Sequence, residues 1–521
     1  DWSPCIGAGT ATGAPTTDIE GNSRPNPAGS NPDMGAYENA LGTPAYMPQL
    51  INVPTDYSTI QAALTAANAT DTVLVQPGTY TENIIWPETN GIKLISAGDS
   101  SNTIIDGGGS ASVITFTGLY PIDSTTIIKG FGITNGNSTN GAGIYINNCG
   151  PIITNCEVYS NAGTGILIQG DNTSIIKTKI SYNTGGIVSS STGVLIDSCT
   201  VLNNEIGVVN SWGNGGSAGG IHLMGSYSRI SNCTISNNRT IGPNYYPGGG
   251  GITLHGNGHI VSNSFIAYNS GPQASAIFCA ITGLNGPDAT IKDNIIYNNL
   301  EGTALKSYNS SSPDVIRNTF ANNSSYAIGG SFSIFKHNSI INNAGVGDGA
   351  SNIDTCTIYN NGSGIDGANI KWSNFISNIG GLSGSSTLDA ENNFWGHSTG
   401  PYHATQNPSG LGDTVTYFAD ILPFLDSPSI YAPPIPVQNA TVTGTGNDFI
   451  SLNWDTSPLG DLAGYKLYYD SDSSGYPYAN SVDVGTDTSY TLSSLTLGTT
   501  YYLAVTTYDT DGNESWYSNE V

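Results

Sequence analysis

The sequence predicts an all-β chain in which a parallel β-solenoid is followed by a small β-sandwich. Two observations predict this fold class. Within residues 153–378, ten segments share one ungapped nine-residue pattern that ends in asparagine. Within residues 437–521, short runs of alternating apolar and polar residues are separated by turn residues. The first pattern is an internal repeat, and the second is typical of a sandwich.

The repeat has three fixed positions besides its asparagine. Ile, Val or Phe stands eight and three residues before the asparagine, and a small or short polar residue stands five before it. The positions five and three before the asparagine are two residues apart, so their side chains share one face of a strand. Coils this short bury their aliphatic residues only by stacking on their neighbours. We expect each asparagine in a left-handed turn. The asparagines are Asn161, Asn183, Asn204, Asn238, Asn269, Asn299, Asn323, Asn343, Asn361 and Asn378.

Several of these stretches resemble a known family. Ile-Thr-Asn-Cys-Glu-Val-Tyr-Ser-Asn (153–161) resembles the right-handed parallel β-helix repeats of the pectate-lyase-like superfamily. Residues 53–80 are similar to that family's N-terminal coil, capped by a short helix near 57–68, and residues 392–401 resemble its closing motif. The resemblance implies a right-handed parallel β-helix over 47–427. It implies no single activity, because enzymes, adhesins and structural proteins share this scaffold.

The two ends of the chain add further modules. Residues 1–46 resemble a tail that commonly follows a β-helix, although here the tail precedes one. Either the chain is a fragment of a longer multi-module protein, or the tail docks on the C-terminal end of a neighbouring subunit; the two interpretations are compatible. Residues 428–436 are rich in proline and predict a semi-rigid linker.

Residues 437–521 resemble a fibronectin type III domain. Trp454 matches its buried tryptophan, and Tyr501 its tyrosine corner. The segment Asp509–Glu514 mimics part of a calcium loop, but the remaining EF-hand spacing is missing, so we interpret it as a polar loop.

Composition narrows the class of partner. The chain has 13 Lys and Arg against 39 Asp and Glu, a net charge of −26. Such a surface repels nucleic acid and anionic membranes, and it would need bridging cations to hold an acidic polysaccharide. No apolar stretch is long enough for membrane insertion. Together with the flanking modules, this composition predicts an extracellular or cell-surface protein.

The seven cysteines predict core packing. Cys156, Cys199, Cys233 and Cys356 occupy the small inward position of the repeat, which indicates buried thiols. No paired CxxC points to zinc. Cys149 and Cys156 are close enough in sequence for a disulfide, and Cys5 is either unpaired or bonded locally.

A ligand site is expected where the coils carry extra residues. Three successive coils are lengthened directly after the asparagine, at 205–219, 239–249 and 270–275. Loops at one turn of stacked coils lie side by side, and aromatic rings beside polar groups suit sugar rings. The alternative is that these aromatics pin the loops to the solenoid wall. The candidates are Trp212, His222, Arg239, Tyr245, Tyr246 and His255.

Catalysis has weaker support. A polysaccharide lyase needs a base and cationic groups, for which Lys177, Lys179 and Arg239 are the candidates. No acidic cluster of the calcium-binding type stacks beside them, and Glu205 lacks the carboxylate partner of a hydrolase. We therefore expect no required cofactor; calcium has no specific motif, and no metal site is identified.

An apolar stripe points to assembly. Outward positions of the later coils carry Phe265, Ile295, Tyr297, Ile341, Tyr359 and Ile376. Such a stripe packs against a loop, another module or another subunit. The sequence thus favours a structural or adhesive protein, a self-associating stalk or fibre subunit with carbohydrate contacts. The alternative is a secreted lyase that uses the 205–260 loop face.

Overall fold

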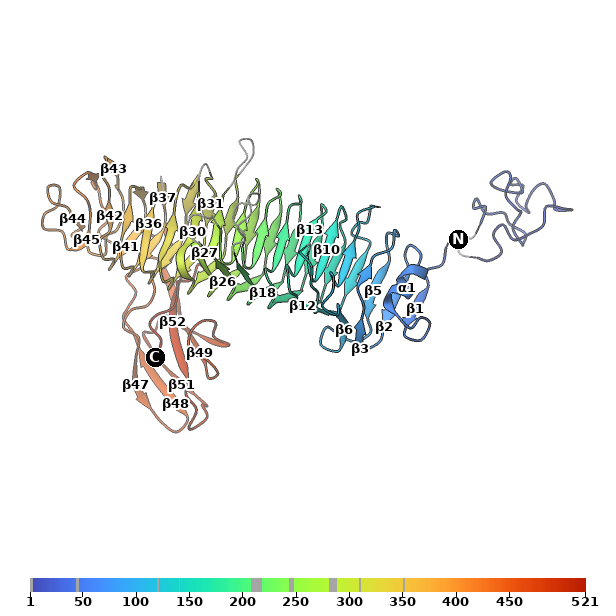
Figure 1. Cartoon of the computed structure of the whole chain (residues 1–521). Coiled ribbons are helices and arrows are strands. Elements are labelled where there is room, and N and C mark those ends of the chain that lie inside the picture. The colour runs from blue at the N-terminus through green and yellow to red at the C-terminus, as the bar shows by residue number, and fades with distance from the viewer. Residues whose placement is uncertain are drawn as a thin grey trace.

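The computed structural model describes residues 3–43, 46–119, 121–139, 141–207, 218–242, 248–280, 288–308, 311–349 and 352–521. Figure 1 shows a rod of stacked coils, with a small β-sandwich projecting from its side in the C-terminal half. The N-terminal segment lies beyond the other end of the rod. The predicted fold class, a parallel β-helix followed by a sandwich, is confirmed.

Each coil contributes strands to three long parallel sheets, which we call sheets 1, 2 and 3. Sheet 1 contains β1 (Leu50–Val53), β2 (Thr72–Val75), β5 (Lys93–Ser96), β8 (Ile127–Lys129), β11 (Ile152–Thr154), β14 (Ser174–Ile176), β17 (Leu195–Asp197), β21 (Arg229–Ser231), β25 (Ile260–Ser262), β28 (Thr290–Lys292), β31 (Asp314–Ile316), β34 (Ile334–Lys336), β37 (Asn352–Asp354) and β40 (Asn369–Lys371).

Sheet 2 contains β3 (Gly78–Thr81), β6 (Thr103–Asp106), β9 (Gly132–Thr134), β12 (Glu157–Tyr159), β15 (Lys179–Ser181), β18 (Thr200–Leu202), β22 (Thr234–Ser236), β26 (Phe265–Ala267), β29 (Ile295–Tyr297), β32 (Thr319–Ala321), β35 (Ser339–Ile341), β38 (Thr357–Tyr359) and β41 (Asn374–Ile376).

Sheet 3 contains β4 (Ile84–Ile85), β7 (Ile114–Phe116), β10 (Ile144–Asn147), β13 (Ile166–Gln169), β16 (Ile187–Ser189), β19 (Glu205–Gly207), β20 (Ile221–Leu223), β23 (Arg239–Ile241), β24 (Ile252–Leu254), β27 (Ser270–Cys279), β30 (Leu300–Ser307), β33 (Tyr326–Gly329), β36 (Gly345–Asp348), β39 (Ile365–Asp366) and β42 (Leu382–Ser383).

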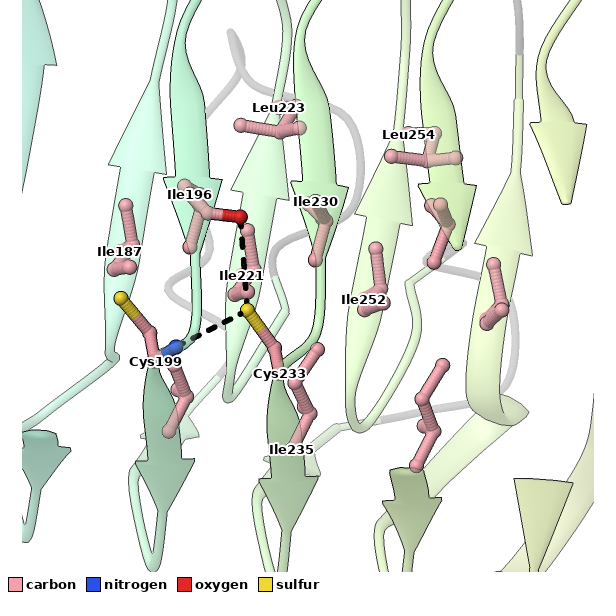
Figure 2. Close-up of a cluster of buried hydrophobic side chains, with 14 of the residues drawn as sticks. Ile187, Ile196, Cys199, Ile221, Leu223, Ile230, Cys233, Ile235, Ile252 and Leu254 are labelled. Carbon is pink, nitrogen blue, oxygen red and sulfur yellow. Dashed lines mark hydrogen bonds between the residues drawn. The ribbon is translucent and has the colours of Figure 1, made fainter. Parts of the chain in front are cut away.

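The repeated pattern crosses from sheet 1 to sheet 2, and its aliphatic residues form the core. Ile230 and Ile235, eight and three residues before Asn238, are fully buried, and Figure 2 shows equivalent residues stacked from coil to coil. The thiols of Cys199 and Cys233 fill the corner between the two sheets (Figure 2). The Sγ atom of Cys233 accepts the Cys199 backbone N–H at 3.4 Å. None of the seven cysteines forms a disulfide, so Cys149 and Cys156 are not linked.

The ladder asparagines differ from the expectation in one respect. In all ten repeats the left-handed residue is the one directly before the asparagine, such as Asn237 with φ 54° before Asn238. The asparagine side chain instead turns inward and is buried. Each Nδ2 donates to Oδ1 of the next coil's asparagine at 2.8–3.1 Å, from Asn161 to Asn378. An amide suits this position because it both donates and accepts.

Both ends of the rod are covered. Helix α1 (Ile60–Ala66) buries Ile60, Ala63 and Leu64 against the first coil, and Thr59 caps its N-terminus. At the other end, Trp395 is buried and stacks on Phe375 with ring centroids 4.7 Å apart. The short strands β43 (Leu388–Asp389), β44 (Pro401–Tyr402), β45 (Gly412–Thr414) and β46 (Ala419–Asp420) complete this end. Closed ends leave fewer unpaired strand edges.

The sandwich consists of two antiparallel sheets. One contains β47 (Thr441–Thr445), β48 (Phe449–Asn453) and β51 (Ser489–Ser493); the other contains β50 (Asn480–Gly485), β49 (Leu462–Asp470) and β52 (Tyr502–Asp509). Trp454 packs edge-on against Tyr465 in its core. The Tyr501 hydroxyl accepts the Thr496 N–H at 3.1 Å, which is the hydrogen bond of a tyrosine corner.

The sandwich is docked on the apolar stripe of sheet 2. Tyr297 and Ile341 share a buried cluster with Trp516, and the Tyr297 and Trp516 ring centroids lie 5.6 Å apart. Ile376 packs with Ile435. Of the three occupants that the sequence left open, the structure therefore shows another module of the same chain. Lateral association through this stripe would first require the sandwich to leave it.

The predicted linker is also packed on the rod. Ile435 is buried in a cluster with Ile376 of the rod, and its carbonyl accepts the hydroxyl of Thr507 in the sandwich at 2.7 Å. The backbone N–H of Ser429 donates to Oδ1 of Asn374 at 2.8 Å. Residues 428–436, predicted as a semi-rigid linker, thus contact both domains that they connect. Proline restricts the backbone but leaves carbonyl and apolar groups free to pack.

Candidate functional site

The predicted loop face lies on sheet 3. Trp212, Tyr245 and Tyr246 fall outside the described residues. Arg239 opens β23, which pairs in register with β19, and its Nη1 lies 3.7 Å from a carboxylate oxygen of Glu205. Both side chains are half-exposed, so this ion pair contributes little to stability. Arg239 therefore lies at the surface, with part of its charge already matched.

His222 and His255, both expected to point outward, lie together; His222 is buried and His255 is half-buried. The His222 side chain leaves the outer face of β20 and is buried, with its ring centroid 5.2 Å from that of His255. Burial, together with the charge of His255, lowers the pKa of His222 to about 3. His222 is therefore neutral at physiological pH and is unsuited to direct sugar contact. Strand alternation predicts the face that a side chain leaves, but not what covers that face.

Lys177 and Lys179 lie on a different wall from Arg239. They line a hollow of about 450 Å³ at the corner between sheets 1 and 2. The Lys179 Nζ lies 2.7 Å from a carboxylate oxygen of Glu157, its register partner on β12. The structure thus separates Arg239 from Lys177 and Lys179, so the three candidate lyase residues make no common acid–base centre.

A groove that the sequence interpretation missed lies on the C-terminal part of sheet 3. It measures about 640 Å³ and is lined by Tyr326, Asp348, Asp366 and Ser383. Asp348, Asp366 and Ser383 are register partners on the consecutive strands β36, β39 and β42, so they form an outward column. The Ser383 hydroxyl donates to Oδ1 of Asp366 at 2.7 Å. We call this the sheet-3 groove.

The Tyr326 ring lies against the next coil because that coil has a glycine there. Gly345 is the register partner of Tyr326, and a Cβ on Gly345 would lie 2.7 Å from the Tyr326 ring. The ring is half-exposed at the edge of the groove. Any larger residue at 345 would displace the ring, so the glycine positions an aromatic face beside the column of carboxylates.

The sequence held a signal for this column. Asp348, Asp366 and Ser383 each stand five residues after a ladder asparagine. Counting from the ladder asparagines therefore predicts that these three residues lie together on sheet 3.

The groove places an aromatic face beside two carboxylates. A pyranose stacks its C–H face on an aromatic ring, and its hydroxyls donate charge-assisted hydrogen bonds to carboxylates. Convergent polar groups in a concavity of this size are typical of ligand sites. Among the described residues, no group of three or more His, Cys, Asp or Glu is placed to hold a metal ion.

Comparisons with known proteins identify both modules. A family model described as right handed beta helix region matches residues 78–215, 118–242 and 210–362. The fibronectin type III model matches residues 435–521. No curated protein matches the chain. Within the described ranges, no helix has the length and apolar character that crossing a membrane requires.

Solved structures are similar to parts of the chain or to most of it. The fibronectin type III domain of human fibronectin type III domain containing protein 3 is 28% identical over 17% of this chain and 84% of its own, with a TM-score of 0.15. A Fn3-like protein from Clostridium thermocellum is 24% identical, over 17% and 90%, with a TM-score of 0.16. The tailspike protein of E. coli bacteriophage HK620, solved with a pentasaccharide, is 12% identical, over 91% and 86%, with a TM-score of 0.31.

Proposed function

The chain belongs to the right-handed β-helix family and ends in a fibronectin type III domain, and from this premise we propose that it is an extracellular or cell-surface adhesive protein that binds carbohydrate through the sheet-3 groove. β-Helix and fibronectin type III domains are typical of extracellular proteins. The rod supplies a rigid support, because every coil is bonded to its neighbours by three parallel sheets.

One observation carries this proposal. The sheet-3 groove combines the half-exposed Tyr326 ring with the outward column of Asp348, Asp366 and Ser383. Its three members lie on consecutive coils, about 4.8 Å apart. Successive rungs therefore offer hydrogen-bond acceptors at a regular spacing along the rod. This geometry suits a stretch of neutral glycan lying along the rod better than a single small molecule.

Neutral glycans are favoured over acidic ones. The groove presents two carboxylates, and the whole chain carries a net charge of −26. An acidic polysaccharide would be repelled by both. A lyase acting on acidic sugars receives no support, because Arg239 lies apart from Lys177 and Lys179.

The test is glycan binding by the full chain and by groove variants. A panel of neutral oligosaccharides is titrated calorimetrically, and the parent chain is expected to bind at least one of them. Replacing Tyr326→Ala should weaken that binding about tenfold, since loss of an aromatic contact costs about 1.4 kcal/mol. Asp366→Asn should weaken glycan binding by more than Tyr326→Ala does, because a charged acceptor becomes a neutral amide.

Tyr57→Ala serves as the matched control, because Tyr57 is an exposed tyrosine near the other end of the rod. Unchanged affinity in Tyr326→Ala, or equal losses in both tyrosine variants, would contradict the assignment of the groove. Chromatography of the glycan after incubation separates adhesion from catalysis. If the parent chain shortens the glycan and Asp366→Asn does not, the protein is a glycan hydrolase and not an adhesive protein.

A further inference from the structure

A second hollow, on another wall of the rod, concentrates positive charge. The chain has 13 Lys and Arg in all, and three of them, Lys129, Lys177 and Lys179, line the hollow of about 450 Å³ between sheets 1 and 2. Asp99 and Glu157 also line it. We call this hollow the lysine groove. Its local charge of about +1 (three cations and two anions) contrasts with the −26 of the whole chain.

The β-helix register brings these lysines together. Lys129 ends β8 on the outer face of sheet 1, and Thr154 is its register partner one coil further along. Lys179 begins β15 and is the partner of Glu157 on that same intermediate coil. Lys177 lies in the corner turn before β15, where its φ of 48° is left-handed. All three lysine side chains are exposed, and they come from the two coils on either side of this intermediate coil, so their ammonium groups can reach one bound group.

The two acidic residues already have partners. Glu157 forms the ion pair with Lys179 at 2.7 Å. The Asp99 carboxylate accepts the Ser101 hydroxyl at 2.6 Å and the Ser101 N–H at 2.8 Å, and these hydrogen bonds lower the pKa of Asp99. In the part of the chain that the structure describes, Lys129 and Lys177 form no ion pair. The groove therefore offers two ammonium groups whose charge is not matched by a neighbour.

We propose that the lysine groove binds one oxyanion group, a phosphate or a sulfate. Ammonium groups bind such oxyanions as point charges with several donors each. The small size of the ligand follows from the charge of the molecule. Salt screens the attraction of the lysines beyond about 10 Å. The rest of a long anionic polymer would therefore only be repelled by the surrounding acidic surface. This site lies on a different wall from the sheet-3 groove and adds an anion-binding function to the proposed carbohydrate adhesion.

The experiment measures oxyanion binding by the intact chain. Inorganic phosphate, inorganic sulfate and glucose 6-phosphate are titrated at low ionic strength, and binding is followed by calorimetry and by ³¹P NMR for the two phosphates. We expect saturable binding that weakens as sodium chloride is added. The double replacement Lys129→Met with Lys177→Met should weaken binding by tenfold or more. Methionine keeps the apolar stem, and both side chains are exposed, so folding should be unaffected.

Lys93→Met is the matched control, because Lys93 is an exposed lysine of sheet 1 that does not line the groove. Its binding should equal that of the parent chain. Absence of saturable binding in the parent chain, or the same affinity in the double variant and in Lys93→Met, would overturn the proposal. Binding of the two inorganic ions without glucose 6-phosphate identifies a free ion as the ligand; tighter binding of glucose 6-phosphate identifies a phosphorylated sugar. Neutral glycan binding by the double variant should be unchanged, which separates this proposal from the sheet-3 groove.

Discussion

At the scale of single residues, buried asparagine side chains hold the coils in register. Asn238 is representative: its Oδ1 accepts from the backbone N–H and Nδ2 of Asn204, and its Nδ2 donates to the Val201 carbonyl and to Asn269. An amide inside a dry core is costly unless it is fully bonded. Each buried asparagine amide therefore makes all its hydrogen bonds only when the next coil stacks in the correct register.

Replacing Asn238→Ala should lower the free energy of unfolding of the β-helix by about 3 kcal/mol. The change removes the bonds just described and leaves buried donors and acceptors without partners. Chemical denaturation followed by circular dichroism measures the effect. The neighbouring change Asn237→Ala is the control, because Asn237 is exposed and has φ 54°. It should cost only about 1 kcal/mol, the penalty for alanine in the left-handed region. Equal losses in the two variants would contradict the ladder's role.

Asp413 ends the asparagine ladder at the C-terminal side. It is half-buried, and its Oδ2 accepts the Asn378 backbone N–H at 3.1 Å and the Asn378 Nδ2 at 2.8 Å. Burial raises the pKa of Asp413 above its ordinary value of 3.8, an effect that the two hydrogen bonds only partly oppose. Because the folded-state pKa is raised, the folded state prefers the protonated acid. The contribution of Asp413 to stability is thus greatest below pH 3.8 and falls as pH rises through the folded-state pKa.

Asp413→Asn should therefore raise the melting temperature at pH 7, because a neutral amide continues the ladder without the cost of a desolvated charge. The gain should disappear below about pH 3.8, where the parent carboxyl is protonated in both states. Differential scanning calorimetry across this pH range tests both statements. Asp420→Asn, at an exposed position, should show no such pH-dependent gain. A loss of stability at pH 7 would contradict the prediction.

At the scale of elements, the docking of the sandwich explains the apolar stripe. Trp516 packs with Tyr297 of β29 and Tyr476, and it belongs to the cluster on sheet 2 rather than to the core of the sandwich. Aromatic residues on an outer sheet face are a sign of a covered surface. Here the cover is supplied by a segment more than two hundred residues away in the sequence.

Trp516→Ala should release the sandwich from the rod while leaving both domains folded. The change removes the largest contact of the cluster, at a cost of about 3 kcal/mol in docking free energy. Small-angle scattering should show a larger radius of gyration, and proteolysis should cut faster within residues 428–436. Leu497→Ala is the control, because Leu497 is exposed on the sandwich. Scattering and cleavage identical to those of the parent chain would disprove the bracing role of Trp516.

At the scale of the whole molecule, shape and charge govern association. The net charge of −26 on the whole chain makes copies repel one another at low salt. The segment 3–43 has its own polar network, in which Arg24 Nε lies 2.6 Å from Glu38. Leu411, Tyr417 and Phe418 are exposed at the C-terminal end of the β-helix. We propose that residues 1–46 of one copy dock on this end of the next.

Deleting residues 1–46 should then abolish concentration-dependent association. Light scattering of the intact and shortened chains at 0.5 M salt, where charge repulsion is screened, is the appropriate measurement. The intact chain should grow in mass with concentration, and the shortened chain should not. The Trp516→Ala variant provides a comparison for lateral association through the released stripe. Equal masses for the intact and shortened chains would remove the head-to-tail arrangement.

The sequence alone determined the β-helix, its inward residues and the C-terminal module. Ile230, Ile235 and Cys233 are set by a period-two strand pattern and by stacking of identical coils, and both are properties of a short segment and its nearest repeat. Only the tertiary structure decided the state of the outward residues. It buried His222 and covered Tyr297 with Trp516. The physical reason is that an outward side chain meets segments far away in the sequence, whose positions no local periodicity contains.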